Sequence, residues 1–178
     1  MISAGEENQL TTVEEMTDIE QIESPSPPLA GPVLSNMLLG EDEFIEPPQM
    51  LRDLNGEQAA NKPVGAPTSI AHIVSHMQFW QHRNLAVING QKPPYPKDPD
   101  QTWGEVRPDQ WLDLVGDFLT DLDQMMALTE NDSGLSRDLG EDETVGDRIR
   151  WTAIHNAYHF GQIALLRRMQ GLWPPEGE

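Results

Sequence analysis

The stretches TSIAHIVSHMQFWQHRN, residues 68–84, and IRWTAIHNAYHFGQIALLRR, residues 149–168, decide the fold of this chain. In both, apolar residues recur every three or four positions, which is typical of α-helices with one buried face. The same two stretches hold all five histidines, and four of these form the H-x-x-x-H pairs His72/His76 and His155/His159. Residues four apart lie on the same side of a helix. Each pair is therefore expected to project from one helix face.

Start and stop signals around these stretches predict four main helices. Thr68 or Ser69 can cap the helix that ends near Asn89-Gly90. The other three are expected at residues 32–45, 108–126 and about 145–170, with shorter helical pieces at 49–54 and 57–60. No alternating apolar pattern and no hairpin signal indicates a strand. The expected fold class is therefore all-α, a four-helix bundle with long loops at residues 91–106 and 131–144.

The charge of the chain is concentrated at its N-terminus. The net charge is −19, and residues 1–60 contain thirteen acidic residues but one basic residue, Arg52. Residues 1–28 have few large apolar groups and end in SPSPP, so they gain too little from burial to offset the entropy cost of ordering. We predict an acidic N-terminal arm at 1–28, flexible or docked, before a bundle domain at 29–178. The arm could instead dock on another surface, because it has an apolar residue at every third position. These residues are Leu10, Val13, Met16, Ile19 and Ile22.

Composition and sequence patterns argue against several classes of function. The acidic charge repels phosphate backbones and no basic stripe compensates it, which argues against nucleic-acid binding. No apolar run approaches the roughly 20 residues of a membrane span, and no signal peptide is visible. With no cysteine, any metal site must use nitrogen and oxygen ligands. The default expectation is a cytoplasmic protein.

The helical phase of the histidines predicts a metal site that is not symmetric. His76 lies well inside the apolar stripe of its helix, whereas His72 lies nearer the edge and His82 on another face. A metal bound by His76 from one helix and by His155 and His159 from another would keep coordination positions open for water or substrate. The alternative, that these are surface histidines or histidines satisfied by other partners, stays open at this point.

A family resemblance supports the metal site. The segments MLRDLNGEQAANKPVGAPTSI, SIAHIVSHMQFWQ and HNAYHFGQIALLRRMQGLWPP, with their wide spacing, resemble the DinB-like (DNA-damage-inducible) superfamily of metal-binding four-helix bundles over residues 47–175. The resemblance implies an up-down-down-up bundle with a divalent metal ion on His76, His155 and His159. The family has an acidic or other polar residue at the position of His72, so no ligand role is implied there. The family name does not imply DNA binding.

The resemblance also implies a function. We expect a metal-dependent enzyme, a transferase or hydrolase, that catalyses thiol transfer or hydrolysis on a small electrophilic substrate. Zinc and nickel are the favoured ions and iron is an alternative. The residues expected around the ligands are Gln162, Asn156, Tyr158 and Trp80, with Trp151 as a further wall. A homodimer is expected from the resemblance. The alternative is a non-enzymatic, metal-stabilised helical-bundle interaction module, to which a stress-related role would belong.

Overall fold

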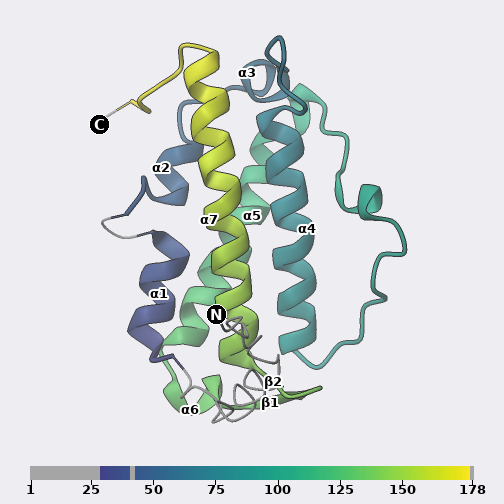
Figure 1. The fold of residues 1–178 in the computed structure, drawn as a ribbon, viewed down its shortest axis with the longest axis vertical. Helices are drawn as coiled ribbons and strands as arrows, with labels where there is room; N and C mark the ends of the chain where they lie inside the picture. The colour runs from purple at the N-terminus through teal and green to yellow at the C-terminus, as the bar shows by residue number, and fades with distance from the viewer. Residues whose placement is uncertain (1–28, 41–42, 177–178) are drawn as a thin grey trace, which may run out of the picture.

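The computed structural model describes residues 29–40 and 43–176, which fold as a helical bundle (Figure 1). The bundle consists of α1 (Gly31–Leu39), α4 (Ile70–Ile88), α5 (Trp111–Thr129) and α7 (Val145–Met169). Helix α1 packs against α5 and α7, and α4 packs against the same two helices. The expected all-α fold class is confirmed. The connecting elements are α2 (Pro47–Leu51), α3 (Gly56–Ala60), η2 (Pro99–Thr102), η3 (Pro108–Gln110), α6 (Asp132–Leu135), β1 (Asp138–Gly140) and β2 (Glu143–Thr144).

The four main helices run in two directions. At one end of the bundle, α6 follows α5 and lies beside the start of α1. There the Gly31 amide donates to the Asp132 carboxylate of α6 at 2.9 Å. At the other end the Trp111 indole, at the start of α5, donates to the Leu54 carbonyl at 2.8 Å. Helices α1 and α7 therefore run one way and α4 and α5 the other (Figure 1). This is the up-down-down-up order that the family resemblance implied.

Helix α1 is shorter than the sequence suggested. It ends at Leu39, because Gly40 takes a left-handed backbone conformation with φ 70° and its amide donates to the Asn36 carbonyl. Glycine adopts that conformation without steric cost. The expectation that the helix continues to Phe44 and Ile45 is therefore wrong.

The loop at residues 131–144 contains a small β-hairpin that the sequence analysis did not expect. Strands β1 and β2 pair antiparallel, and the turn between them places Glu141 and Asp142 at φ 56° and 58°. Two consecutive positive φ angles match the right-handed twist of a short hairpin. The prediction that no strand or hairpin forms is wrong here, because two or three residues per strand are too few to show alternation.

Side-chain caps fix where the two histidine-bearing helices begin. Ser69 accepts the His72 amide at 3.3 Å and so caps α4, as one of the two predicted alternatives. Thr144 accepts the Asp147 amide at 3.2 Å, and the Asp147 carboxylate accepts the Thr144 amide at 3.1 Å. This reciprocal capping box satisfies two amides at the start of α7.

A buried polar layer separates two apolar clusters in the core. One cluster lies towards α2 and α3 and includes Phe118 and Phe160, and the other lies towards α6 and includes Leu34 and Ile149. Between them Asn156 donates to the Gln81 side chain at 2.8 Å, and Asn84 donates to the Thr152 hydroxyl at 2.9 Å. Buried polar groups are costly without partners, so these two bonds favour one rotation of α4 against α7. That rotation sets where their histidines point.

Two sequence predictions concern features beyond the bundle core. Among residues 29–40 and 43–176, no helix has both the length and the apolar content to cross a bilayer. The predicted arm at residues 1–28 lies outside the described residues, so its boundary with the bundle domain stays a prediction.

Candidate metal centre

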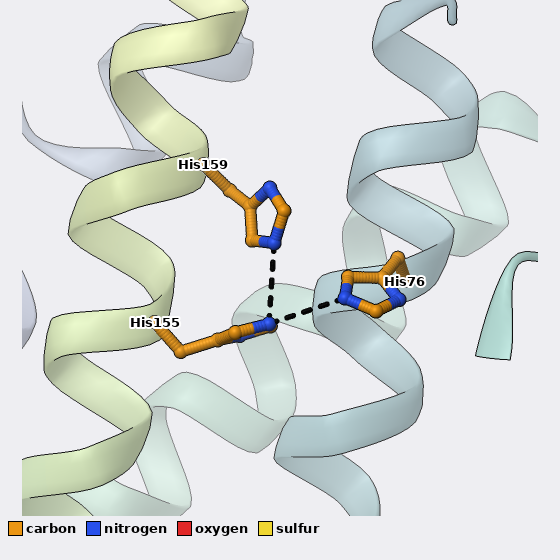
Figure 2. A group of neighbouring side chains, drawn as sticks. All are labelled: His76, His155 and His159. Atoms are coloured by element: carbon orange, nitrogen blue, oxygen red, sulfur yellow. Dashed lines mark hydrogen bonds between the residues drawn. The ribbon is translucent and has the colours of Figure 1, made fainter. Parts of the chain in front are cut away.

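Three imidazole rings from two helices converge on one point (Figure 2). The Nε2 atom of His155 on α7 lies 3.2 Å from Nε2 of His76 on α4 and 3.2 Å from Nε2 of His159. The ligand atoms of all three lie within 4.8 Å of one another, and the described part of the chain has no other such group of three or more His, Asp or Glu side chains. The structure thus brings together the three residues that the sequence analysis selected.

The far sides of two rings are held by hydrogen bonds that fix their tautomers. The Thr102 hydroxyl donates to the Pro99 carbonyl at 2.7 Å, so its oxygen is left to accept Nδ1–H of His76 at 2.8 Å. The Gln162 side-chain oxygen accepts Nδ1–H of His159 at 2.7 Å. With Nδ1 protonated in both rings, each Nε2 carries a lone pair that faces the shared point.

The spacing of the three nitrogens fits a bound cation. With His155 also protonated at Nδ1, three Nε2 lone pairs meet at the shared point, and His155 Nε2 lies 3.2 Å from each of the other two. Nitrogen ligands about 2.0–2.1 Å from a tetrahedral ion lie roughly 3.3 Å apart, close to the two separations that involve His155. The donor set and its geometry show that this histidine group could hold a divalent metal ion.

Burial keeps the three imidazoles in the neutral form that binds metals. Burial, reinforced by the neighbouring His159, lowers the pKa of His76 and the pKa of His155 from 6.5 to about 4 each. Burial also lowers the pKa of His159, while its bond to Gln162 opposes the shift. His76 and His159 are only 9 % and 4 % exposed. All three rings are therefore neutral near pH 7 and need no deprotonation before they bind an ion.

The loop between α4 and α5 supplies residues that the sequence analysis did not select. Besides Thr102, this loop places the Trp103 ring parallel to the His76 ring, with centroids 3.9 Å apart and an interplanar angle of 10°. It is anchored on α4 where the Gly104 amide donates to the Ser75 hydroxyl at 3.0 Å. The sequence predicts a long loop here but does not show which of its residues return to the helix.

The other candidate residues lie around the centre as follows. Tyr158 accepts a hydrogen bond from the Gln162 amide at 3.1 Å, and its ring lies 5.0 Å from that of His159. The Trp80 ring lies 6.5 Å from the His76 ring. Asn156 instead joins α7 to α4 through Gln81, within the polar layer.

The remaining candidates lie away from the three rings. Trp151 is exposed on the surface of α7. His72 contacts the Ser69 hydroxyl at 3.2 Å, and the largely exposed His82 lies 3.1 Å from the Asp121 carboxylate. Neither histidine belongs to the convergent group, as the helical phase had predicted.

Comparison with known protein families places the chain in one of them. Residues 48–163, about two thirds of the chain, match the family model of the DinB superfamily. No curated protein and no solved structure matches the chain. The matched span includes all three convergent histidines, the whole of α4 and most of α7, up to Ile163. From the fold, the histidine group and this match, the chain belongs to the DinB superfamily.

Proposed function

We propose that this protein is a metal-dependent enzyme that catalyses thiol transfer or hydrolysis on a small electrophilic substrate. The observation that carries the proposal is the convergence of three neutral imidazoles with Nε2–Nε2 separations of 3.2 Å. Three protein ligands leave coordination positions of a divalent ion free, the arrangement of catalytic rather than closed structural sites. A divalent cation there lowers the pKa of a water or thiol that occupies a free position.

The residues around the ligands would hold this centre rigid. Thr102 and Gln162 fix the two rings whose Nδ1 atoms they bind, and such outer hydrogen bonds also raise the basicity of the ligand. Trp103 covers one face of the His76 ring and limits the access of water from that side. Tyr158, whose hydroxyl accepts from the Gln162 amide, lies at the edge of the centre and helps to hold Gln162 in place.

Nitrogen ligands restrict the choice of metal but do not fix it. Three imidazoles suit zinc, nickel and iron, and the lack of carboxylate ligands in the group disfavours calcium and magnesium, which prefer oxygen. We propose zinc or nickel as the resident ion, with iron as the alternative.

Metal analysis of the purified protein tests the site itself. We expect one divalent ion per chain and a rise in melting temperature on its addition to chelator-treated protein, because an ion that binds only the folded state stabilises it. His155→Ala should abolish both effects. His72→Ala, on the same helix as His76 but outside the group, is the matched control and should keep both. A native protein with no bound ion and no metal-dependent stabilisation would refute the proposal.

Activity assays separate the enzyme from its alternative. The metal-loaded protein is tested with p-nitrophenyl acetate for hydrolysis, and with 1-chloro-2,4-dinitrobenzene and a low-molecular-weight thiol for transfer. We expect the wild type to show turnover in one of these assays. His155→Ala should lack this turnover, and His72→Ala should retain it.

The second candidate function is a non-enzymatic, metal-stabilised interaction module. The burial of His76 and His159 favours it, because it leaves only His155 among the three partly open to solvent. Stoichiometric metal that stabilises the fold, together with no turnover in any of the assays, would select this candidate.

A further inference from the structure

Helix α7 carries a row of large apolar side chains that face solvent. Trp151, Ile154, Tyr158 and Leu165 are 56 %, 47 %, 65 % and 57 % exposed. Their separations of three, four and seven residues place them on one face of the helix, and we call this set the α7 stripe. Exposed apolar side chains gathered on one helix face usually mark an interaction site.

The surroundings of the α7 stripe are less acidic than the rest of the protein. Helix α7 carries four arginines and one acidic residue, in a chain whose net charge is −19. Of these arginines, Arg167 is buried, while the exposed Arg168 and the half-buried Arg150 follow one flank of the stripe. On that flank a groove of about 360 Å³ lies between Ile154 and the exposed Val33 of α1. An occupant that combines apolar and acidic residues would match this surface.

We propose that residues 10–22 of the same chain dock along the α7 stripe. This segment contains five apolar residues three apart, together with four acidic residues and no basic one. Its apolar residues could cover the stripe, and its carboxylates could lie beside the arginines on the flank. The five apolar residues are Leu10, Val13, Met16, Ile19 and Ile22.

The chain connection allows this docking. The described part of the chain begins at residue 29, next to α6. There the Gly31 amide donates a hydrogen bond to the Asp132 carboxylate. Helix α7 begins at the same end, with Gly146 packed against the Leu135 carbonyl of α6 (Figure 1). Residues 23–28 span up to about 20 Å when extended. The stripe itself extends over roughly 21 Å of helix from Trp151 to Leu165. The segment can therefore reach the stripe without leaving its own molecule.

A second copy of the chain fits the α7 stripe less well. Two molecules with a net charge of −19 each repel one another, whereas the acidic segment of one molecule is already tethered beside the stripe. The homodimer expected from the family resemblance stays a prediction.

A spin label on the full-length protein tests the docking. The chain has no cysteine, so Thr17→Cys gives a single attachment point for a nitroxide. The reporter is the indole N–H signal of Trp151, assigned through Trp151→Phe. We expect the oxidised label to remove most of the intensity of this signal relative to the reduced label. The buried Trp111 signal, near the far end of the bundle, should stay unchanged.

Two matched surface variants and a mixing experiment make the test specific. Leu165→Ser shortens the stripe and should restore much of the Trp151 signal, whereas Leu112→Ser, at the 76 % exposed Leu112 on α5, should not. A mixture of labelled molecules with isotope-enriched, unlabelled ones should show no loss, because docking is within one molecule. The proposal would be overturned by equal signal losses at Trp151 and Trp111, or by no loss at either. A loss in the mixture would also overturn it, because a second copy would then supply the occupant.

Discussion

Thr102 lies 26 residues from His76 in the sequence, yet its hydroxyl oxygen is 2.8 Å from the Nδ1 atom of that histidine. The bond joins the loop after α4 back to the helix and holds the ring with Nε2 towards the other two histidines. The loop is thus part of the candidate metal centre rather than a simple connection.

Replacement of Thr102 by valine should weaken metal binding without removing a ligand. Valine keeps the shape of threonine but leaves Nδ1–H of His76 without its acceptor, and loss of such outer partners typically costs about 10–100-fold in metal affinity. Competition with a chromophoric chelator measures the affinity. Thr102→Ser keeps the hydroxyl and should stay close to the wild type. Equal affinities for the valine and serine variants would show that the bond does not orient the ring.

Gln162 is expected to act in the same way on His159. Gln162→Leu removes the acceptor that lies 2.7 Å from Nδ1 and should reduce metal affinity by about tenfold or more. Tyr158→Phe is the control, because it removes only the hydroxyl that accepts from the Gln162 amide and leaves the bond to His159 in place. If the phenylalanine variant loses as much affinity as the leucine variant, the effect comes from packing around the site and not from the acceptor.

The metal-free protein should become less stable as the pH falls from about 6.5 to about 4. In the unfolded chain His76 and His155 titrate near 6.5, whereas burial lowers the pKa of each to about 4 in the folded protein. Between these values the unfolded chain binds more protons, so the free energy of unfolding decreases with falling pH. Above pH 6.5 these two groups contribute no slope. Urea unfolding across this range measures the effect.

A variant and a second titrating group control this experiment. His155→Ala removes one of the three histidines whose pKa burial lowers, so it should show a shallower slope over the same range. Asp147, whose pKa is lowered chiefly by its bond to the Thr144 hydroxyl, loses its contribution only below about pH 4, outside this window. A wild-type slope that His155→Ala leaves unchanged would contradict the assignment to the histidine group.

Arg167 should be a major contributor to stability, although it is charged. It is 1 % exposed, its guanidinium binds both Asp53 oxygens at 2.9 and 3.1 Å, and it donates to the carbonyls of Met50 and Leu172. Arg167→Ala leaves the Asp53 carboxylate, whose side chain is 16 % exposed, without its charged partner and leaves two carbonyls without their donor. We expect a loss of about 3 kcal/mol, the lower end for a broken buried pair, because Asp53 still accepts the Glu176 amide. Denaturant unfolding of the metal-saturated protein measures the loss.

The neighbouring Arg168 is the matched control for this prediction. Its guanidinium lies over the Trp173 ring at 3.9 Å and faces solvent. Arg168→Ala should therefore cost no more than about 1 kcal/mol. Similar losses for the two alanine variants would mean that the hydrogen bonds of Arg167 add nothing beyond those of a surface arginine.

The sequence by itself determined the features that depend on neighbours along the chain. The apolar period and the caps predicted α4, α5 and α7, because helix periodicity and capping involve residues within four positions of one another. The placement of His155 and His159 on one helix face follows from the same periodicity. Local signals were too weak to predict the end of α1 at Gly40 or the β1–β2 hairpin. In both places the positive φ angles of one or two residues decide the local structure.

Only the tertiary structure decided which groups complete the candidate metal centre. Whether His76 faces His155 depends on the rotation of α4 against α7, which the bonds from Asn156 to Gln81 and from Asn84 to Thr152 help to fix. The return of Thr102 and Trp103 to α4 depends on how a long loop packs, and no local pattern encodes it. The physical reason is that these contacts join residues 26 to 79 positions apart, so they form only when the helices pack together.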